Sequence, residues 1–136
     1  MRCAIQTAQY CFENVLPKTD SRRVFLLPDA QEITDLPCDI GSAPAAITHE
    51  FGELVDTRMV AEDWTSKKGK YGTDPESLQE WARRLRRWLR DQPEAEIVVV
   101  SQAGFLEYVT GSNLDDNGEL RDFVSGWKQF LHFSRR

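Results

Sequence analysis

Histidine and cysteine are scarce in this chain, and the few that are present form no site motif. The 136 residues include 2 histidines, His49 and His132, and 3 cysteines, Cys3, Cys11 and Cys38. The histidines lie far apart and no CxxC pair is present, so the sequence gives no support for a metal centre or another cofactor. The odd number of cysteines favours free, mostly packed thiols in a reducing cytosol, and we expect a cytoplasmic protein.

An excess of basic residues and a long apolar run are also missing. Asp and Glu outnumber Lys and Arg by 22 to 17, for a formal net charge of −5, so nucleic acid is not an expected partner. No apolar stretch approaches the roughly 20 residues of a membrane span. Gln6, Gln9 and Glu13 interrupt any signal-peptide core near the N-terminus. The length fits one domain, residues 1–136.

Helix and strand patterns alternate along the chain. The β-branched run EIVVVS is typical of a strand buried on both faces of a parallel sheet. Alternation predicts an α/β fold, which we take as a three-layer α/β/α sandwich with a reduced, mostly parallel sheet. Helices are predicted at 3–15, within 44–60, at 75–92 and at 104–110; strands are predicted at 23–27 and 96–101, with a terminal edge strand in the tail GWKQFLHF and a polar turn at 113–119.

The strongest helix signal is at 75–92. Asp74 can cap this helix, and Pro75 stands at its first position. Its apolar stripe has helical spacing: Leu78, Trp81, Leu85, Trp88 and Leu89. Five arginines cover much of the remainder: Arg83, Arg84, Arg86, Arg87 and Arg90. In an acidic chain this pattern favours a solvated helix face over an anion or nucleic-acid patch.

The turn Ser101-Gln102-Ala103-Gly104 joins a predicted strand to a predicted helix. The N–H groups of a helix N-terminus at such a turn can bind an anion. Because ligands gather at the carboxyl ends of parallel strands, the long loop 28–42 after the other strand should open on the same edge. We therefore expect four of its residues to face Gln102: Glu32, Asp35, Asp39 and Ser42. Trp64 and Tyr71, in the polar loop 62–73, either frame a pocket there or cover the core.

Five segments resemble, in order, the histidine phosphatase superfamily, and in particular fungal phosphoglycerate mutase-like proteins. CAIQTA at 3–8 is similar to the family's Arg-Ala-Ile-Gln-Thr-Ala helix start, and IVVVSQAGF at 97–105 resembles a strand ending in Ser-His-Gly-Gly-Phe. The other matching segments are LLPDAQEITDLPCDIGS at 26–42, DWTSKKGKYG at 63–72 with the Arg-rich helix, and weakly the closing GWKQFLHF. The resemblance implies a phosphate-handling fold of the phosphoglycerate mutase type.

The residues that carry the family's chemistry are largely replaced here. The resemblance implies a nucleophilic His in an Arg-His-Gly motif, which would stand ahead of this chain's first residue together with a central strand. Cys3 stands where the second phosphate-binding Arg is expected, with Arg2 one position early; Gln102 replaces the second His and Ala103 the glycine after it. Glu32 alone has a clear counterpart, the proton donor.

Three functions stay open on these residues. The first is a degenerate phosphatase-like domain without efficient phosphomonoesterase activity, whose Arg2, Gln102 and Ala103 keep a weak site for a small phosphorylated or other anionic ligand. The second is an active phosphomonoester hydrolase whose N-terminal segment is missing from this sequence. The third is a non-catalytic interaction module, possible as a homodimer, in which an exposed sheet edge pairs with another chain.

Overall fold

The computed structural model describes residues 1–14, 16, 24–111, 119–125 and 128–134, the last two ranges as backbone strands. Helices and strands occur together in the chain, which agrees with the expected α/β class. The helices are α1 (Arg2–Phe12), α2 (Pro44–Phe51), α3 (Pro75–Asp91) and α4 (Ala103–Thr110), with 3-10 turns η1 (Pro28–Ala30), η2 (Gly52–Leu54) and η3 (Gly69–Tyr71). The strands are β1 (Val24–Phe25), β2 (Val55–Asp56), β3 (Glu96–Ser101), β4 (Glu119–Ser125) and β5 (Lys128–Ser134).

Helix α3 begins and ends where its sequence signals place it. The Asp74 carboxylate accepts a hydrogen bond from the Ser77 N–H at 2.9 Å, and Pro75 follows at the first helical position. The apolar stripe faces inward, because Leu78, Trp81, Leu85 and Leu89 are buried. The prediction of a capped, amphipathic helix at 75–92 is therefore confirmed to within one residue.

Helix α2 covers only the first half of the segment predicted to contain it. Gly52 follows Phe51 with a φ of 56°, and its N–H donates to the Thr48 carbonyl. A glycine in this left-handed region ends a helix, since other residues adopt it at a cost. The chain then passes through η2 into β2, a strand that the sequence patterns did not indicate.

The strands form two separate groups, and only the smaller one is parallel. β1 pairs with β2 in parallel, through Val24 opposite Val55 and Phe25 opposite Asp56. The larger sheet has the order β3-β5-β4, and both of its pairings are antiparallel. The parallel arrangement predicted for β3 is therefore wrong. Only residues 126–127 separate β4 from β5, and a connection of that length joins antiparallel neighbours.

The C-terminal tail differs from its predicted position in the sheet. It does form a strand, β5, but β5 lies between β3 and β4 and is not an edge strand. β4 was not anticipated: Glu119, assigned to a polar turn, is its first residue, and the rest of that turn lies outside the described residues. β3 is itself an edge strand, and the Val98 side chain is 44% exposed. The prediction that this strand is buried on both faces is therefore wrong.

The core is built around large aromatic side chains. Trp64, Trp81 and Phe105 are fully buried. The Tyr71 ring meets the Trp81 ring edge-on, with 6.2 Å between centroids. Trp64 and Tyr71, for which a pocket-framing role was also open, both belong to this core. Their burial in the loop 62–73 explains how a polar stretch holds a defined path across the molecule.

The cysteines are free, as predicted, but they are not packed. Cys3, Cys11 and Cys38 are all exposed. In α1 the buried positions are Ile5, Thr7 and Ala8. Cys3 lies on the far side of the helix from Ile5, because two residues correspond to more than half a turn. Cys11 has the helical spacing of the apolar positions, but its side chain is exposed, so the prediction that it packs is wrong.

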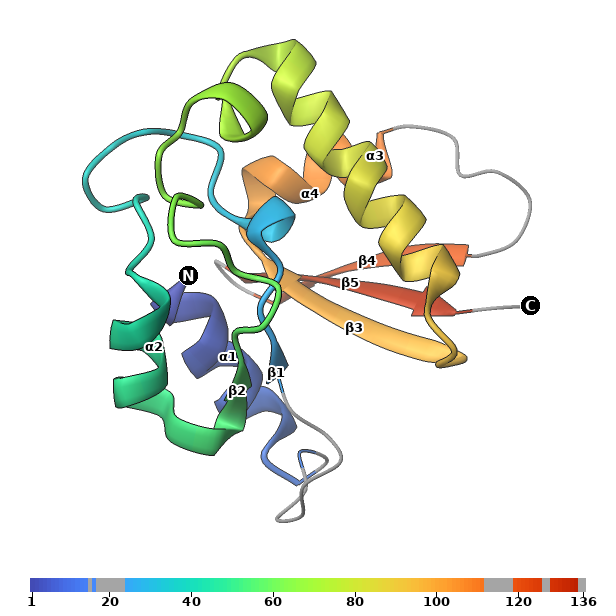
Figure 1. Cartoon of the computed structure of the whole chain (residues 1–136). Helices are drawn as coiled ribbons and strands as arrows, with labels where there is room; N and C mark the ends of the chain where they lie inside the picture. Colours follow the sequence, from blue (N-terminus) through green and yellow to red (C-terminus); the bar gives the residue numbers. More distant parts are fainter. Residues whose placement is uncertain (15, 17–23, 112–118, 126–127, 135–136) are drawn as a thin grey trace.

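Figure 1 shows how these elements lie around the strands. The β1–β2 pair stands beside α1 and α2, whereas α3 crosses in front of the three-stranded sheet. α3 packs on α4 and on η1. Within the described residues, no helix combines the length and the apolarity needed to cross a membrane.

Candidate functional site

The end of β3 is fixed to the loop that follows β1. The Ser101 hydroxyl donates a hydrogen bond of 2.8 Å to the Ala30 carbonyl, and Ser101 is 5% exposed. Gln102 then caps α4 through its carbonyl, which accepts from the Leu106 N–H at 3.1 Å. The Gln102 side chain makes no capping hydrogen bond to the helix. The predicted strand-to-helix turn is therefore present, with Gln102 at its tip.

A cavity of about 610 Å³ opens beside this turn. Its walls come from α1, from β1 with the loop after it, and from β3. Most of the lining side chains are apolar, among them Ile5, Ala8, Leu26, Val98 and Val100. The volume is in the range of small-molecule pockets, roughly 300–1,000 Å³.

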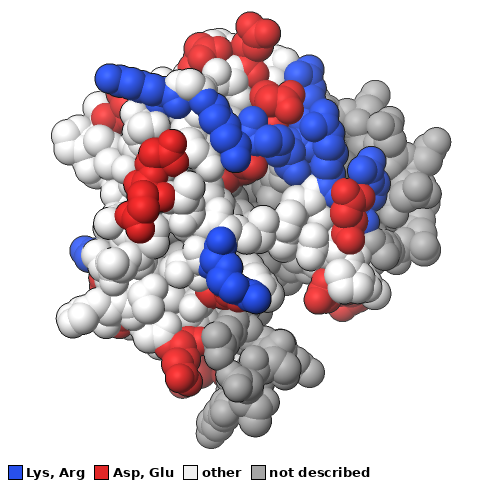
Figure 2. Space-filling model, in the orientation of Figure 1, with Lys and Arg blue, Asp and Glu red and all other residues white. Residues whose placement is uncertain are grey.

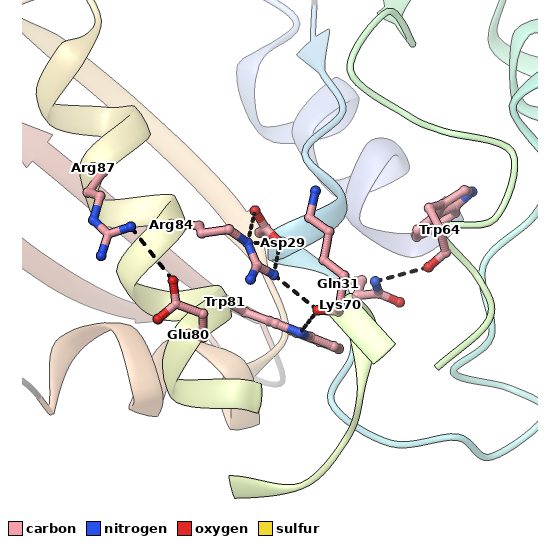
Figure 3. Close-up of polar contacts among 8 residues, drawn as sticks. All are labelled: Asp29, Gln31, Trp64, Lys70, Glu80, Trp81, Arg84 and Arg87. Carbon is pink, nitrogen blue, oxygen red and sulfur yellow. Dashed lines mark hydrogen bonds and ion pairs between the residues drawn. The ribbon is translucent and has the colours of Figure 1, made fainter. Parts of the chain in front are cut away.

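Glu32 and Gln102 line the same cavity, as the sequence predicted. One Glu32 carboxylate oxygen accepts from the Ile33 N–H at 3.1 Å. The neighbouring Gln31 is 3% exposed and donates through its amide nitrogen to the Trp64 carbonyl at 3.2 Å (Figure 3). Its amide oxygen has no hydrogen-bond partner among the described residues. A buried acceptor without a partner costs about 1–3 kcal/mol, so Gln31 is a polar group that the described residues satisfy only in part.

The other residues expected at the turn lie elsewhere. The Asp39 carboxylate accepts from the Thr34 hydroxyl, and the Ser42 carbonyl accepts from the Trp64 indole N–H at 3.1 Å. Neither these two nor Asp35 lines the cavity. Asp35 and Asp39 instead act on Lys67, where their charges oppose the fall in its pKa.

The candidate anion-binding residues are only partly brought together. Arg2 forms an ion pair with Glu50 of α2 at 2.8 Å and does not line the cavity. Ala103 is the first residue of α4, directly after Gln102. The turn thus offers backbone N–H groups and the Gln102 amide, with the Glu32 carboxylate nearby. An anion here would meet that negative charge, which weakens binding.

Lys67 is a residue near this site that the sequence did not single out. It is 9% exposed, and its ammonium group donates to the Glu32 carbonyl while lying 5.6 Å from the centre of the Trp81 ring. Burial lowers the Lys67 pKa, and the charge of Glu32 acts in the opposite direction. Lys67 also has a φ of 54°. It therefore joins the loop after β1 to α3 from a strained backbone position.

The arginines of α3 are engaged in contacts within the fold. Arg84 binds Asp29 in η1, with a shortest distance of 2.6 Å. Arg86 donates to the Tyr108 and Val109 carbonyls at the end of α4, at 3.3 and 3.1 Å. Figure 2 shows Lys and Arg side chains gathered over α3, with acidic side chains among them. Part of this predicted solvated face therefore holds α3 against its neighbours.

The histidines provide no described side chain in the cavity lining. His49 is an exposed residue of α2, and the backbone of His132 lies in β5 opposite Val98. Among the described residues, no group of three or more His, Cys, Asp or Glu side chains is placed to hold a metal ion. The described cavity thus has mainly apolar walls with a smaller set of polar side chains: the carboxylates of Glu32, Asp56, Glu94 and Glu96, the amides of Gln31, Gln92 and Gln102, the Ser101 hydroxyl and the Arg58 guanidinium.

Comparisons of this chain with protein-family models, with curated proteins and with solved structures found no match. The resemblance to the histidine phosphatase superfamily accordingly rests on its five ordered motifs, and the function it implies stays a prediction.

Proposed function

We propose that this chain is a non-catalytic domain with a histidine phosphatase-like, three-layer framework, and that it binds another molecule in the cavity beside β3. The observation that carries the proposal is the 610 Å³ cavity itself, which adjoins the Gln102 turn and has mainly apolar walls. When a ligand covers apolar surface that faces a cavity, the binding free energy becomes more favourable by roughly 25 cal/mol per Å².

The side chains of the cavity support binding better than catalysis. Phosphoryl transfer by the route that the resemblance implies needs a nucleophile and positive charge on the phosphate. The Ser101 hydroxyl is committed to the Ala30 carbonyl, and the three cysteines are exposed outside the lining. Arg58 lines the cavity, but its guanidinium is paired with Asp56 at 2.6 Å. Without a nucleophile in the cavity, Glu32 has no phosphoryl transfer to assist as a proton donor.

A weak anion-binding property of the Gln102 turn is the second candidate. The first N–H groups of α4 lack partners within the helix, and the Gln102 side chain is not used as a cap. The Glu32 carboxylate beside them opposes binding. We expect inorganic phosphate to bind only at millimolar concentration, and Glu32→Gln to strengthen that binding when it is measured by calorimetry.

The first test compares turnover of a generic phosphomonoester by the wild-type chain and by Glu32→Gln. We expect both to match the buffer blank. Turnover that is present in the wild type and lost in Glu32→Gln would overturn the non-catalytic proposal and favour the hydrolase hypothesis.

The second test measures binding of a neutral apolar dye whose fluorescence rises on burial. Val98 lines the cavity and is 44% exposed, so Val98→Lys changes the wall without placing a charge in the core. Leu36, 55% exposed and outside the lining, provides the matched control Leu36→Lys. We expect the dye to bind the wild type and the control alike and Val98→Lys at least several-fold more weakly. Equal binding by all three proteins would contradict a cavity function.

A further inference from the structure

The cavity runs along the edges of two strands. Every residue from Glu96 to Gln102 lines it, and so does every residue from Val24 to Leu27. Successive side chains of a strand point to opposite faces. A cavity that meets all of them in sequence therefore lies beside the strand edge and does not lie over one face. β1 and β3 thus border the same space edge-on.

Both of these edges are free of strand partners in the described part of the chain. β1 has β2 on one side only, and β3 has β5 on one side only. Alternate residues of an edge strand direct their N–H and C=O groups away from the sheet. Such an edge is a template for pairing with another extended segment. Here two templates line one apolar cavity.

The charges around the cavity define what such a segment should carry. Its acidic lining residues are Glu32, Asp56, Glu94 and Glu96, and its basic side chain is Arg58. Arg58 is paired with Asp56, and the charge of Glu32 acts on the nearby Lys67. Glu94 and Glu96 have no basic partner among the described lining residues. Glu32 lies near the Gln102 end of β3, and Glu94 and Glu96 lie at its other end. A segment with basic residues at both ends complements this distribution.

We propose that the cavity accepts an extended segment of another polypeptide, which adds a strand between β1 and β3. The segment is apolar over about six residues, the length of β3, and is flanked by Lys or Arg. Its backbone pairs with both free edges and joins the two strand groups into one sheet, a form of β-strand addition. This inference rests on the proposed binding function of the cavity and names the class of its partner.

The test uses synthetic peptides with the full chain. The probe is a peptide of six alternating Val and Thr residues with two lysines at each end, labelled with a fluorophore. Two control peptides keep its length: one has glutamates in place of the lysines, and one has a proline at the third Val position. We expect the lysine-flanked peptide to bind at least tenfold more tightly than either control, with a preference over the glutamate-flanked peptide that shrinks as salt rises. Equal affinity for the proline peptide would overturn strand addition, because proline removes a ladder donor.

Matched variants locate the peptide on the chain. Val98→Lys on β3 and Phe25→Lys on β1 change exposed residues of the two edges, which are 44% and 49% exposed. Each should weaken peptide binding at least tenfold, while Leu36→Lys should not. Replacing Glu94 and Glu96 by Gln should weaken binding of the lysine-flanked peptide, whereas the same change at the exposed Glu62 and Glu107, outside the lining, should have little effect. Hydrogen exchange should show new protection at Phe25 and at alternate amides of β3; binding without that protection would overturn the proposal.

The outcomes distinguish strand addition from the proposed binding function of the cavity, on which it rests. If the dye binds the cavity but no peptide does, the binding function stands and strand addition is wrong. If neither binds, both are wrong. If the chain self-associates with rising concentration, loses this association in Val98→Lys and is not dissociated by the peptide, the occupant is a second copy and a basic partner segment is wrong.

Discussion

The Arg84 guanidinium forms an ion pair with the Asp29 carboxylate, 55 positions away in sequence. Three hydrogen bonds join the two groups, with donor–acceptor distances of 3.0, 3.0 and 2.6 Å (Figure 3). Arg84 also reaches the Lys70 carbonyl at 3.3 Å, which accepts from the Trp81 indole N–H at 2.9 Å. The bonds to Asp29 raise the Arg84 pKa. This pair therefore ties α3 to the loop that forms one wall of the cavity.

A double-mutant cycle should show that this pair stabilises the fold. We expect Asp29→Asn and Arg84→Gln to be coupled by about 1 kcal/mol or more in the free energy of unfolding, because both side chains are more than three-quarters buried and the bonds are charge-assisted. The measurement is urea unfolding of the four proteins of the cycle.

The control cycle uses Arg87 and Glu80 on the exposed face of α3. Their atoms lie 3.6 Å apart, with side chains 59% and 39% exposed. Exposed pairs of this kind contribute little, and we expect a coupling below about 0.5 kcal/mol. Similar coupling in both cycles would show that burial of the Arg84 pair adds nothing.

The indole of Trp64 leaves no room for a side chain at Gly41. A Cβ at position 41 would lie 1.9 Å from the nearest Trp64 ring carbon, and Trp64 is fully buried. We expect Gly41→Ala to lower the free energy of unfolding by about 1–3 kcal/mol, as overpacking does. Thermal unfolding measures this loss.

A second substitution tests whether the clash is with the indole. In the background of Trp64→Leu the ring is gone, so Gly41→Ala should cost much less than in the wild type. If the cost of Gly41→Ala is the same in both backgrounds, another contact constrains this glycine.

Local signals fixed the parts of the fold that depend on neighbours in sequence. Asp74 and Pro75 define the start of α3. The turn at Gln102 ends β3, and Gly111 follows the last residue of α4. Each of these boundaries depends on residues close in sequence, so these elements could be predicted. The order β3-β5-β4 depends on which strands meet across the chain. The run EIVVVS has the same β-branched composition as a strand covered on both faces, and its sequence alone does not show that one edge is open.

The candidate site could be predicted only in outline. Gln102 and Glu32 share the cavity as predicted, but not through one parallel sheet. The hydrogen bond from the Ser101 hydroxyl to the Ala30 carbonyl joins the end of β3 to the loop after β1. Lys67 was missed because its neighbours, Lys68 and Gly69, make it look like part of a solvated turn. Its burial depends on Trp81 and on the Glu32 carbonyl, 35 positions away in sequence. No local periodicity carries that information.

Titration of Asp74, the N-cap of α3, should make the free energy of unfolding depend on pH in the acid range. Hydrogen bonds from the Ser77 hydroxyl and N–H lower the Asp74 pKa below its ordinary value of 3.8. A carboxylate with a depressed folded-state pKa stabilises fully above its unfolded pKa, and this contribution is lost as pH falls through the folded value. We therefore expect the wild type to lose stability below pH 3.8 more steeply than Asp74→Asn, whose amide caps the helix without titrating.

Thermal unfolding between neutral pH and strong acid checks this slope. Asp63→Asn removes the same charge from an exposed turn residue and controls for net charge. Parallel pH profiles for the wild type and Asp74→Asn would contradict a titrating cap.

Lys67 allows its backbone strain to be separated from its side-chain contacts. Both Lys67→Ala and Lys67→Gly remove the ammonium bond to the Glu32 carbonyl and the contact with Trp81, so both should be less stable than the wild type. They differ in the backbone, because a φ of 54° costs an alanine about 1 kcal/mol that glycine avoids. We expect Lys67→Gly to be the more stable of the two by about that amount. At the exposed helical position Gln79 the order should reverse, since glycine costs about 1 kcal/mol relative to alanine inside a helix. Urea unfolding of the four variants gives both differences, and an alanine more stable than glycine at both positions would show that Lys67 is not strained in solution.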